Sequence, residues 1–468
     1  MKKLFMCALC AIAALSARSE VRLPQIFSDG MVLQQQTTCR LWGTAAPKKQ
    51  LTVVTSWDQQ TYTVRTSADG KFEMQVSTPA AGGPYDITFD DGQRLVLRNI
   101  LLGEVWLCSG QSNMEMPMKG YKAQPVAGAI DALLDSNDPS LRLFTVKRHA
   151  ALTPANDVEG QWSEATVATV REFSATAYFF GRCLRRQLGV PVGLIVTAWG
   201  GSACEAWMTR EWLRAFPKVK LPATDDDVQR LQQRCPTALY NGQLAPIIGF
   251  TLRGTIWYQG EDNIPRYDFY APLMARMVQG WRDVWQQGDF PFYYCQIAPY
   301  DYSRLQWDGL SPLLREQQAK VETMVENCRM AVLLDTGLDF CIHPRRKREA
   351  GERLAVLALA HTYDVKGLPD FAAYRGDVTF RGDTAVVAFD RSKEWVYFEH
   401  GPSSDNFEVA GVDRVFHKAE AWIERNRVYV RSDEVKQPVA VRYAFHDWVV
   451  GDLMHDGLPV GSFRTDDW

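Results

Sequence analysis

Two short segments, far apart in this chain, carry side chains that together could cleave an ester. In the first, an apolar run ends at Ser109-Gly110-Gln111-Ser112, where small neighbours leave the Ser112 hydroxyl uncrowded. A serine hydroxyl is a weak nucleophile at neutral pH and needs a base to accept its proton. The second segment, residues 339–344, reads DFCIHP and supplies His343 as the candidate base. This pair predicts acyl transfer, and an imidazole with the ordinary pKa of about 6.5 would make activity rise through that pH.

The elements that must position these residues follow from a second pattern. Five apolar runs end in small or polar residues and alternate with helical patterns; they cover residues 105–108, 193–198, 254–258, 292–297 and 330–334. Strands alternating with helices predict a parallel sheet covered on both faces. Functional sites in such sheets form beyond the carboxyl ends of the strands. The rule gathers Ser112, the 200–201 glycines, the loop from Gln259 and the loop before His343 at one edge.

The flanking regions have a different pattern. Short alternating runs separated by turn residues predict β structure before residue 99 and again after residue 368. We therefore expect a signal peptide at 1–19, a β-sandwich-like domain at 20–98, an α/β esterase domain at 99–368, and a β-rich module at 369–468 packed on the core.

The N-terminus indicates export. Lys2 and Lys3 precede an apolar stretch from Leu4 to Leu15, and small residues follow near Ala17. This is the pattern of a Sec-type signal peptide, so we expect a periplasmic or secreted protein. No other run reaches the about 18 apolar residues of a membrane span. Eight of the ten cysteines lie beyond this leader, where buried free thiols are the favoured interpretation, although export permits disulfides.

Composition and motifs exclude several other classes. The net charge is −3 without basic blocks, which argues against a nucleic-acid partner. There is no HExxH, no closely spaced Cys/His set and no phosphate-binding glycine loop, so we expect neither a metal nor a cofactor. Met114 stands where the GxSxG nucleophile elbow requires glycine, which argues against an α/β-hydrolase. Nothing in the sequence indicates the oligomeric state.

The remaining motifs carry a family resemblance that covers almost the whole chain after the leader. They are GEVWLCSGQSNME at 103–115, WGGS at 199–202, YNG at 240–242, WYQGEDN at 257–263 and IHP at 342–344. Together they resemble the sialate O-acetylesterases, a carbohydrate-esterase branch of the SGNH hydrolases. The resemblance implies an SGNH-like three-layer α/β/α core, Ser112 as nucleophile, His343 as general base and acetylated sugars as substrates. We expect O-acetylated sialic acid as the sugar, hydrolysed through an acetyl-serine intermediate.

An acyl-transfer site also needs donors for the tetrahedral oxyanion. The backbone N–H groups of Ser112 and Gly201 are the candidates. The SGNH pattern adds a side-chain donor, usually an Asn on another strand end, and here Gln259 or Asn263 would have to serve.

The chain departs from the SGNH pattern ahead of the histidine. The position three residues before His343, where the pattern has an Asp, is Phe340. Asp339 and Asp335 remain candidates to orient the imidazole, and a backbone carbonyl holding it would give a Ser–His dyad.

Two alternatives stay open, and a third is a distant one. The same motifs would serve an acetylesterase acting on xylan or another polysaccharide. A catalytically silent sugar-binding protein is compatible with the missing acidic residue. A retaining glycosidase lacks support because no isolated pair of carboxylates can be singled out.

Overall fold

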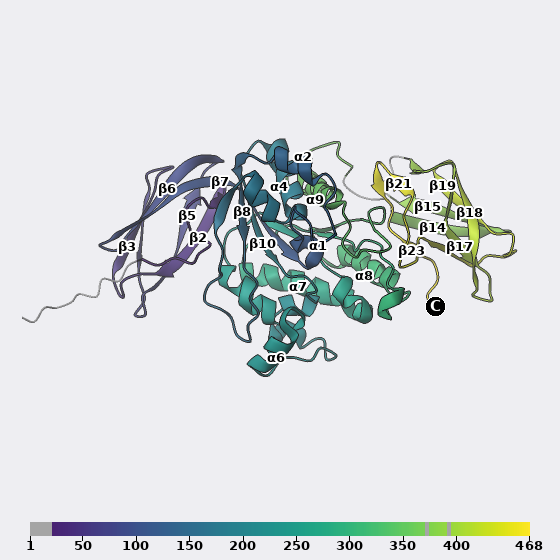
Figure 1. Cartoon of the computed structure of the whole chain (residues 1–468), viewed down its shortest axis with the longest axis horizontal. Coiled ribbons are helices and arrows are strands. Elements are labelled where there is room, and N and C mark those ends of the chain that lie inside the picture. Colours follow the sequence, from purple (N-terminus) through teal and green to yellow (C-terminus); the bar gives the residue numbers. More distant parts are fainter. Residues whose placement is uncertain (1–20, 370–373, 391–394) are drawn as a thin grey trace, which may run out of the picture.

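The computed structural model describes residues 21–369, 374–390 and 395–468. The expected signal peptide at 1–19 therefore lies outside the described residues. Figure 1 shows an elongated molecule with β strands at each end and a mixed α/β region between them. The central region holds Ser112 and His343.

A parallel sheet forms the middle of the molecule, as the alternating pattern predicts. Its strand order is β13-β12-β11-β7-β10-β8-β9, and only the edge strand β9 is antiparallel to its neighbour. The strands are β7 (Arg94–Gly110), β8 (Asp138–Thr145), β9 (Trp162–Ala165), β10 (Val192–Ala198), β11 (Gly254–Tyr258), β12 (Phe292–Cys295) and β13 (Cys328–Ala331). The α/β class is confirmed, and the five predicted strands are β7 and β10–β13.

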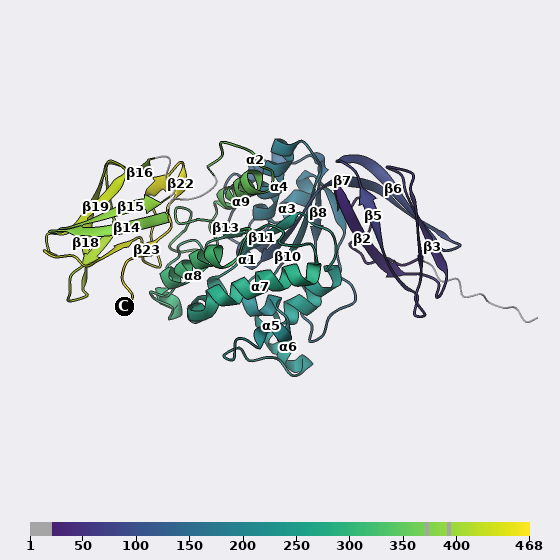
Figure 2. The ribbon, with the colours of Figure 1, turned by 180° about the vertical axis from the view of Figure 1, so that it is seen from behind.

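Side chains alternate between the two faces of this sheet and so build two apolar cores. On β7, Val105 and Leu107 belong to one core, whereas Trp106 and Cys108 belong to the other. Helices α7 and α8 cover the first core, and α4 and α9 cover the second. Figures 1 and 2 show the sheet between these two helix layers.

The α-helices are α1 (Ser112–Glu115), α2 (Ala129–Leu134), α3 (Val167–Glu172), α4 (Ala175–Leu188), α5 (Arg210–Leu213), α6 (Asp225–Leu231), α7 (Tyr270–Trp285), α8 (Ser311–Met324) and α9 (Lys347–His361). Short 3-10 and π segments are η1 (Cys204–Trp207), η2 (Gln232–Arg234), η3 (Tyr240–Leu244), η4 (Ala245–Ile247), η5 (Glu261–Phe269) and η6 (Ser303–Leu305).

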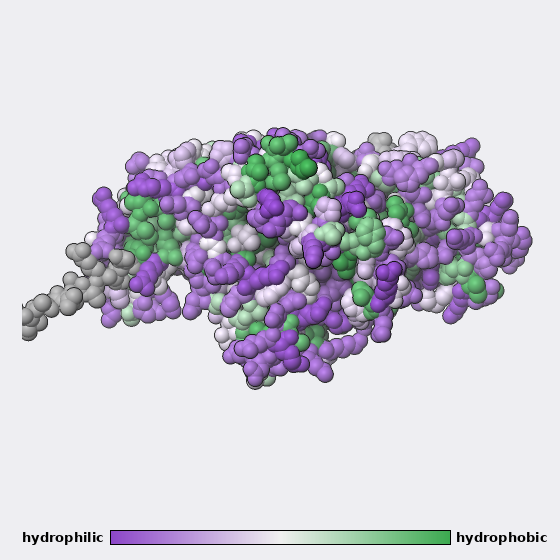
Figure 3. Space-filling view, in the orientation of Figure 1, coloured by the Kyte–Doolittle hydropathy of each residue, from purple (hydrophilic) through white to green (hydrophobic). Residues whose placement is uncertain are grey.

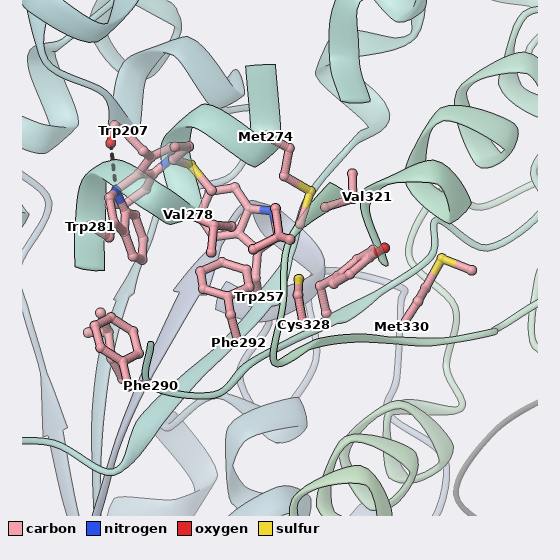
Figure 4. Close-up of a cluster of buried hydrophobic side chains, with 14 of the residues drawn as sticks. Trp207, Trp257, Met274, Val278, Trp281, Phe290, Phe292, Val321, Cys328 and Met330 are labelled. Atoms are coloured by element: carbon pink, nitrogen blue, oxygen red, sulfur yellow. Dashed lines mark hydrogen bonds between the residues drawn. The ribbon is translucent and has the colours of Figure 1, made fainter. Parts of the chain in front are cut away.

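Tryptophans dominate the packing between β11 and α7 (Figure 4). The Trp257 ring meets those of Trp207 and Trp281 edge-on, at centroid distances of 6.0 and 5.7 Å. All three side chains are fully buried, and the Trp281 indole N–H donates to the Trp207 carbonyl at 3.0 Å. Because rings of this size lose so much apolar surface to burial, the cluster anchors α7 firmly on the sheet.

The N-terminal strands are joined to the core through one long strand. The first half of β7 pairs with β6 and β1, and its second half lies in the central sheet. The expected boundary at residues 98–99 thus falls inside β7. The remaining strands are β1 (Val32–Gln34), β2 (Thr37–Thr44), β3 (Gln50–Thr55), β4 (Thr61–Arg65), β5 (Lys71–Thr78) and β6 (Gly82–Asp90).

The C-terminal strands form a seven-stranded sheet, in the order β14-β15-β19-β18-β17-β20-β23, and a three-stranded sheet of β16, β21 and β22. They are β14 (Tyr374–Arg381), β15 (Thr384–Asp390), β16 (Val396–Phe398), β17 (Ser403–Ala410), β18 (Phe416–Glu424), β19 (Arg427–Arg431), β20 (Ala440–Tyr443), β21 (Leu453–His455), β22 (Leu458–Pro459) and β23 (Phe463–Arg464).

The surface of the molecule carries an apolar area over α2 (Figure 3). In this area Ile130 and Leu134 are 74% and 76% exposed. Within the described part of the chain, no helix is both long and apolar enough to cross a membrane. The eight cysteines among the described residues are all unpaired, and seven of them are buried.

Candidate active site

Ser112 lies immediately beyond the carboxyl end of β7, as the strand-end rule predicts. The last residue of the strand, Gly110, has φ +139°, and a Cβ there would lie 2.2 Å from the Tyr258 carbonyl oxygen. Only glycine therefore allows β7 and β11 to come this close before the chain turns. Ser112 is the first residue of α1, and its N–H has no acceptor within that helix. The turn thus presents a hydroxyl and a backbone N–H at the same residue, and this N–H has no acceptor among the described residues.

His343 meets this hydroxyl from the loop between β13 and α9. Its Nε2 lies 2.8 Å from Ser112 Oγ, so the two residues predicted from sequence are brought together. The Tyr121 ring packs edge-on against the imidazole at a centroid distance of 5.2 Å. With a neutral Nε2 as acceptor, this geometry can take the serine proton.

The third partner in this chain is a glutamine. Gln124 Oε1 lies 2.7 Å from His343 Nδ1. An amide oxygen can only accept, so this contact assigns the ring proton to Nδ1 and leaves Nε2 free to accept from Ser112. Unlike a carboxylate, the amide brings no negative charge to offset an imidazolium.

The acidic residues considered as orienters of His343 lie elsewhere. The Asp339 side chain is exposed, and Gln124 occupies the Nδ1 position that Asp339 was expected to fill. Asp335 instead makes a two-pronged pair with Arg353, at 2.7 and 2.8 Å. The expectation for Asp339 is therefore not met in this structure, because the loop turns its carboxylate toward solvent.

The environment of His343 disfavours the charged imidazole. Burial, together with the ammonium of Lys347, lowers the pKa of His343 from 6.5 to about 4. The imidazole is then neutral throughout the pH range in which activity was expected to titrate. The structure thus moves the expected acidic limb of activity from about 6.5 to about 4, with the base available over a wider pH range.

A buried polar network adjoins Ser112 and His343. Asn113, next to Ser112, donates to Glu261 Oε1 at 2.6 Å and to the Ile342 carbonyl at 3.2 Å, and its Oδ1 accepts from Lys347 Nζ at 2.5 Å. Burial raises the pKa of Glu261 and lowers the pKa of Lys347 to about 7. Asn113 therefore links the serine turn to Ile342, the residue that precedes His343, and the buried Glu261 holds this junction by accepting from Asn113.

The glycine pair at the end of β10 packs against Ser112. A Cβ on Gly200 would lie 3.2 Å from the Ser112 Cβ, so the approach depends on a small residue. Glu115 holds this turn by accepting from the Gly200 N–H at 2.8 Å. Gly201 follows in a left-handed conformation with φ +73°, lines the pocket beside Ser112, and its N–H has no hydrogen-bond acceptor among the described residues. Its placement suits an oxyanion donor.

Gln259 and Asn263 do not take the place expected for them as side-chain oxyanion donors. Gln259 donates to the Ser202 carbonyl at 3.1 Å and to Asn263 Oδ1 at 2.7 Å, and Asn263 donates to Glu205 at 2.8 Å. Both side chains are fully buried, and neither lines the pocket. Their amides are consumed in holding the loop after β10, because that loop would otherwise bury unpaired backbone groups.

Ser112 and His343 line a pocket of about 490 Å³. Two arginines with half-exposed side chains, Arg148 and Arg234, lie on its lining. Each already has an acidic partner: Arg148 meets Glu115 at 2.5 Å, and Arg234 meets Asp262 at 2.6 Å. The pocket has room for a small organic ligand and offers it both charged and apolar contacts.

Sequence reasoning missed Gln124, which lies in the segment GYKAQP at 120–125. Its position depends on a local turn in which Ala123 has φ +60° and Tyr121 bridges Gln124. A lone glutamine in a polar loop carries no pattern, so only the fold reveals its contact with His343. The arginines were missed for the same reason.

Comparisons with known proteins identify a family of esterases. Residues 102–355 match the family described as carbohydrate esterase, sialic acid-specific acetylesterase. Sialate O-acetylesterase of Homo sapiens is 29% identical over 388 residues, which cover 75% of this chain and 73% of that protein. The Rattus norvegicus protein of the same name is 28% identical over 412 residues, with 74% of each chain covered.

Among solved structures, a carbohydrate acetylesterase from Xanthomonas citri is 35% identical, with a TM-score of 0.87, and the match covers 96% of this chain and 100% of that one. The resemblance inferred from the motifs is thereby confirmed. Because the family match spans more than half of the sequence and includes both strand-end segments, the chain belongs to the sialic acid-specific acetylesterase family of carbohydrate esterases and is a carboxylic ester hydrolase.

Proposed function

We propose that this protein removes O-acetyl groups from sugars through an acetyl-serine intermediate, with Ser112 as nucleophile and His343 as general base. The observation that carries the proposal is the continuous contact from Ser112 Oγ to His343 Nε2 and from His343 Nδ1 to Gln124, at 2.8 and 2.7 Å. This chain of contacts also counts against a catalytically silent sugar-binding protein, which has no need of it.

The reaction has two steps. His343 Nε2 accepts the Ser112 proton while Oγ attacks the acetyl carbonyl, and the imidazolium then gives that proton to the departing sugar oxygen. Water attacks the acetyl-serine with the same proton exchange and releases acetate. The N–H groups of Ser112 and Gly201 stabilise the oxyanion in both steps, each donor contributing about 10²- to 10³-fold in rate.

Gln124 acts on this reaction as a positioning residue. It holds the Nδ1–H tautomer of His343 and leaves the imidazolium to be stabilised without a carboxylate. We accordingly describe the site as a Ser–His pair oriented by an amide. This replaces both orienters named from sequence, a nearby aspartate and a backbone carbonyl.

We further propose O-acetylated sialic acid as the sugar. Arg148 and Arg234 line the pocket with half-exposed guanidinium groups, which suit the carboxylate of an acidic sugar. The family description and the names of the curated relatives point to the same substrate.

A neutral acetylated polysaccharide is the second candidate. Both arginines already pair with a carboxylate, Glu115 or Asp262, so their charge is offset before any ligand binds. A neutral sugar can enter such a pocket without displacing an ion pair. The related structure from Xanthomonas citri is named only as a carbohydrate acetylesterase.

Acetate release separates these candidates. The parent enzyme is assayed on O-acetylated sialic acid and on acetylated xylan at equal ester concentration, together with Arg234→Gln. An acidic substrate predicts higher kcat/KM on the sialic acid and a selective loss of that activity in Arg234→Gln. Preference for xylan, unaffected by Arg234→Gln, would replace sialate by a neutral polysaccharide.

We also propose an SGNH-like core at residues 99–368 with β modules at 20–98 and 369–468, and export after removal of residues 1–19. Parallel strands between two helix layers support the core assignment. N-terminal sequencing of the protein from an extracellular or periplasmic fraction tests the leader, and a mature N-terminus at Met1 would refute it.

A further inference from the structure

One wall of the catalytic pocket comes from a loop that the proposed chemistry does not use. Residues 300–310, here named the pocket loop, form the later part of the connection between β12 and α8. Leu305 and Trp307 of this loop line the same pocket as Ser112 and His343. Trp307 is half-buried, and Leu305 is 42% exposed. The loop thus brings an indole ring and an aliphatic side chain to the nucleophile's pocket.

The pocket loop has a buried aromatic base. Tyr302 is fully buried, and its ring packs edge-on against Tyr300 at a centroid distance of 4.9 Å. The Trp307 ring lies 6.2 Å from the Tyr302 ring and is tilted by 31°. The Trp307 ring thus packs against a buried ring, which favours one orientation of the indole beside the pocket.

The C-terminal module holds both ends of this loop through one residue. Asp447 accepts from the Gly309 N–H at 2.6 Å and from the Ser311 N–H and hydroxyl at 3.0 and 2.5 Å. At the other end, the Tyr300 N–H donates to the Asp447 carbonyl at 3.1 Å. The Asp447 side chain is buried, so these bonds form away from competing water.

Arg315 of α8 reinforces the same junction. Its fully buried guanidinium donates to the His446 carbonyl at 2.5 Å, to Ser462 Oγ at 3.2 Å and to Ser311 Oγ at 3.4 Å. Figure 1 shows α8 at the side of the core that faces the C-terminal strands. The module is therefore bonded to the loop that shapes the pocket as well as to the helix that follows it.

We propose that Trp307 is the platform on which the sugar ring of the substrate stacks, and that Asp447 is the positioning residue by which the C-terminal module holds this platform. The proposal rests on the proposed sugar acetylesterase function and identifies the residues that recognise the sugar. A pyranose ring has an apolar face of C–H groups that packs on an aromatic ring. Once the acetyl carbon reaches Ser112 Oγ, the sugar must occupy the rest of the pocket, where Trp307 and Leu305 contribute apolar surface.

The test compares a sugar ester with an ester that has no ring. Acetate release is measured from O-acetylated sialic acid, acetylated xylo-oligosaccharide and ethyl acetate for the parent, Trp307→Phe and Trp307→Ala. The quantity compared is the ratio of kcat/KM on the sugar ester that the parent uses to kcat/KM on ethyl acetate. Trp307→Ala lowers this ratio by about tenfold, mostly by raising KM for the sugar ester. Trp307→Phe retains most of the ratio. The control is Trp422→Ala, which removes a partly buried indole that stacks on Tyr429 in the C-terminal module and leaves the ratio unchanged.

Asp447→Ala tests the positioning role. It lowers the same ratio, and the double variant with Trp307→Ala is no worse than Trp307→Ala alone, because both changes act through one ring. The matched control is Asp452→Ala, a buried aspartate of the same module that bonds Ser404 at 3.0 Å and Asn406 at 2.8 Å. Thermal unfolding of each variant detects any general loss of structure.

The outcomes separate the platform from the function on which it rests. If the parent releases acetate from a sugar ester and Trp307→Ala keeps its ratio, the platform is refuted and the esterase assignment stands. If the parent cleaves ethyl acetate but neither sugar ester, the proposed sugar function fails and the platform fails with it. Equal losses in Asp447→Ala and Asp452→Ala, or additive losses in the double variant, would remove Asp447 from the mechanism.

Discussion

Replacing Gln124 by glutamate changes the charge of the orienting group while keeping its shape. Gln124 Oε1 lies 2.7 Å from His343 Nδ1, so a carboxylate there forms an ion pair with the protonated imidazole. An ion pair favours the charged form, and the pKa of His343 therefore rises. Because only neutral imidazole accepts the Ser112 proton, the acidic limb of activity moves to higher pH.

The size of the shift follows from the geometry. Two opposite charges about 4 Å apart interact by about 4 kcal/mol at an effective dielectric constant of about 20. One pKa unit corresponds to about 1.4 kcal/mol, so the upper bound is about three units. The Gln124 side chain is partly exposed, and screening by water reduces this to about one to two units. Starting from a His343 pKa of about 4, the variant titrates near about 5 to 6.

The assay is the pH dependence of kcat/KM for ethyl acetate between about pH 4 and pH 8, with circular dichroism at each pH. The parent keeps a plateau from about pH 5 to pH 8, and Gln124→Glu loses activity as the pH falls below about 6. Gln124→Ala removes one neutral hydrogen bond, worth about 0.5 to 1.5 kcal/mol, and lowers the plateau by about two- to thirteenfold without moving the limb upward. Gln60→Glu, at an exposed position in the turn between β3 and β4, is the charge control.

Two results would refute this reasoning. If kcat/KM of the parent enzyme fell to half its plateau near pH 6.5, burial would not lower the pKa of His343. If the parent and Gln124→Glu lost activity at the same pH, Gln124 would not contact the imidazole during catalysis.

Three further variants test other parts of the site. Asp339→Asn lowers kcat by less than about tenfold because the carboxylate is exposed, and a loss of orders of magnitude with intact circular dichroism would restore Asp339 as orienter. Gly201→Ala places a side chain at φ +73° and lowers kcat by about tenfold or more by shifting the N–H; an unchanged kcat would exclude this donor. Gln259→Leu removes the side-chain donor to the buried Ser202 carbonyl and lowers stability by about 2 kcal/mol or more, so an unchanged thermal midpoint would contradict its structural role.

The sequence predicts this fold well where periodicity is strong. The run at residues 254–258 is β11, and the run at residues 193–198 falls within β10. Both follow from local patterns of buried residues that tertiary packing does not override. The domain boundary expected at residues 98–99 falls within β7, because one continuous strand pairs with two groups of partners and its sequence shows no break.

Some residues of the candidate site could be predicted from the sequence, and others could not. Ser112 and His343 follow from their positions at strand ends and from family motifs. Gln124, by contrast, depends on a turn with no sequence signature, and the His343 pKa depends on burial that only packing creates. Gln259 was expected to donate to the oxyanion because it follows a strand end near Ser112. Its amide instead donates to the Ser202 carbonyl in the loop after β10.

The Ser112→Ala variant tests the central claim most directly. Its hydroxyl contacts His343 Nε2 at 2.8 Å, and its loss leaves only a small gap, so the thermal midpoint should match that of the parent. Ser163→Ala, which removes a hydroxyl bonded to the Leu143 carbonyl, is the control. Acetate release from acetylated sugar should fall by about 10³-fold or more in Ser112→Ala and remain unchanged in Ser163→Ala. A Ser112→Ala enzyme that folds normally and retains a tenth or more of the parent rate would contradict the assignment of Ser112 as nucleophile.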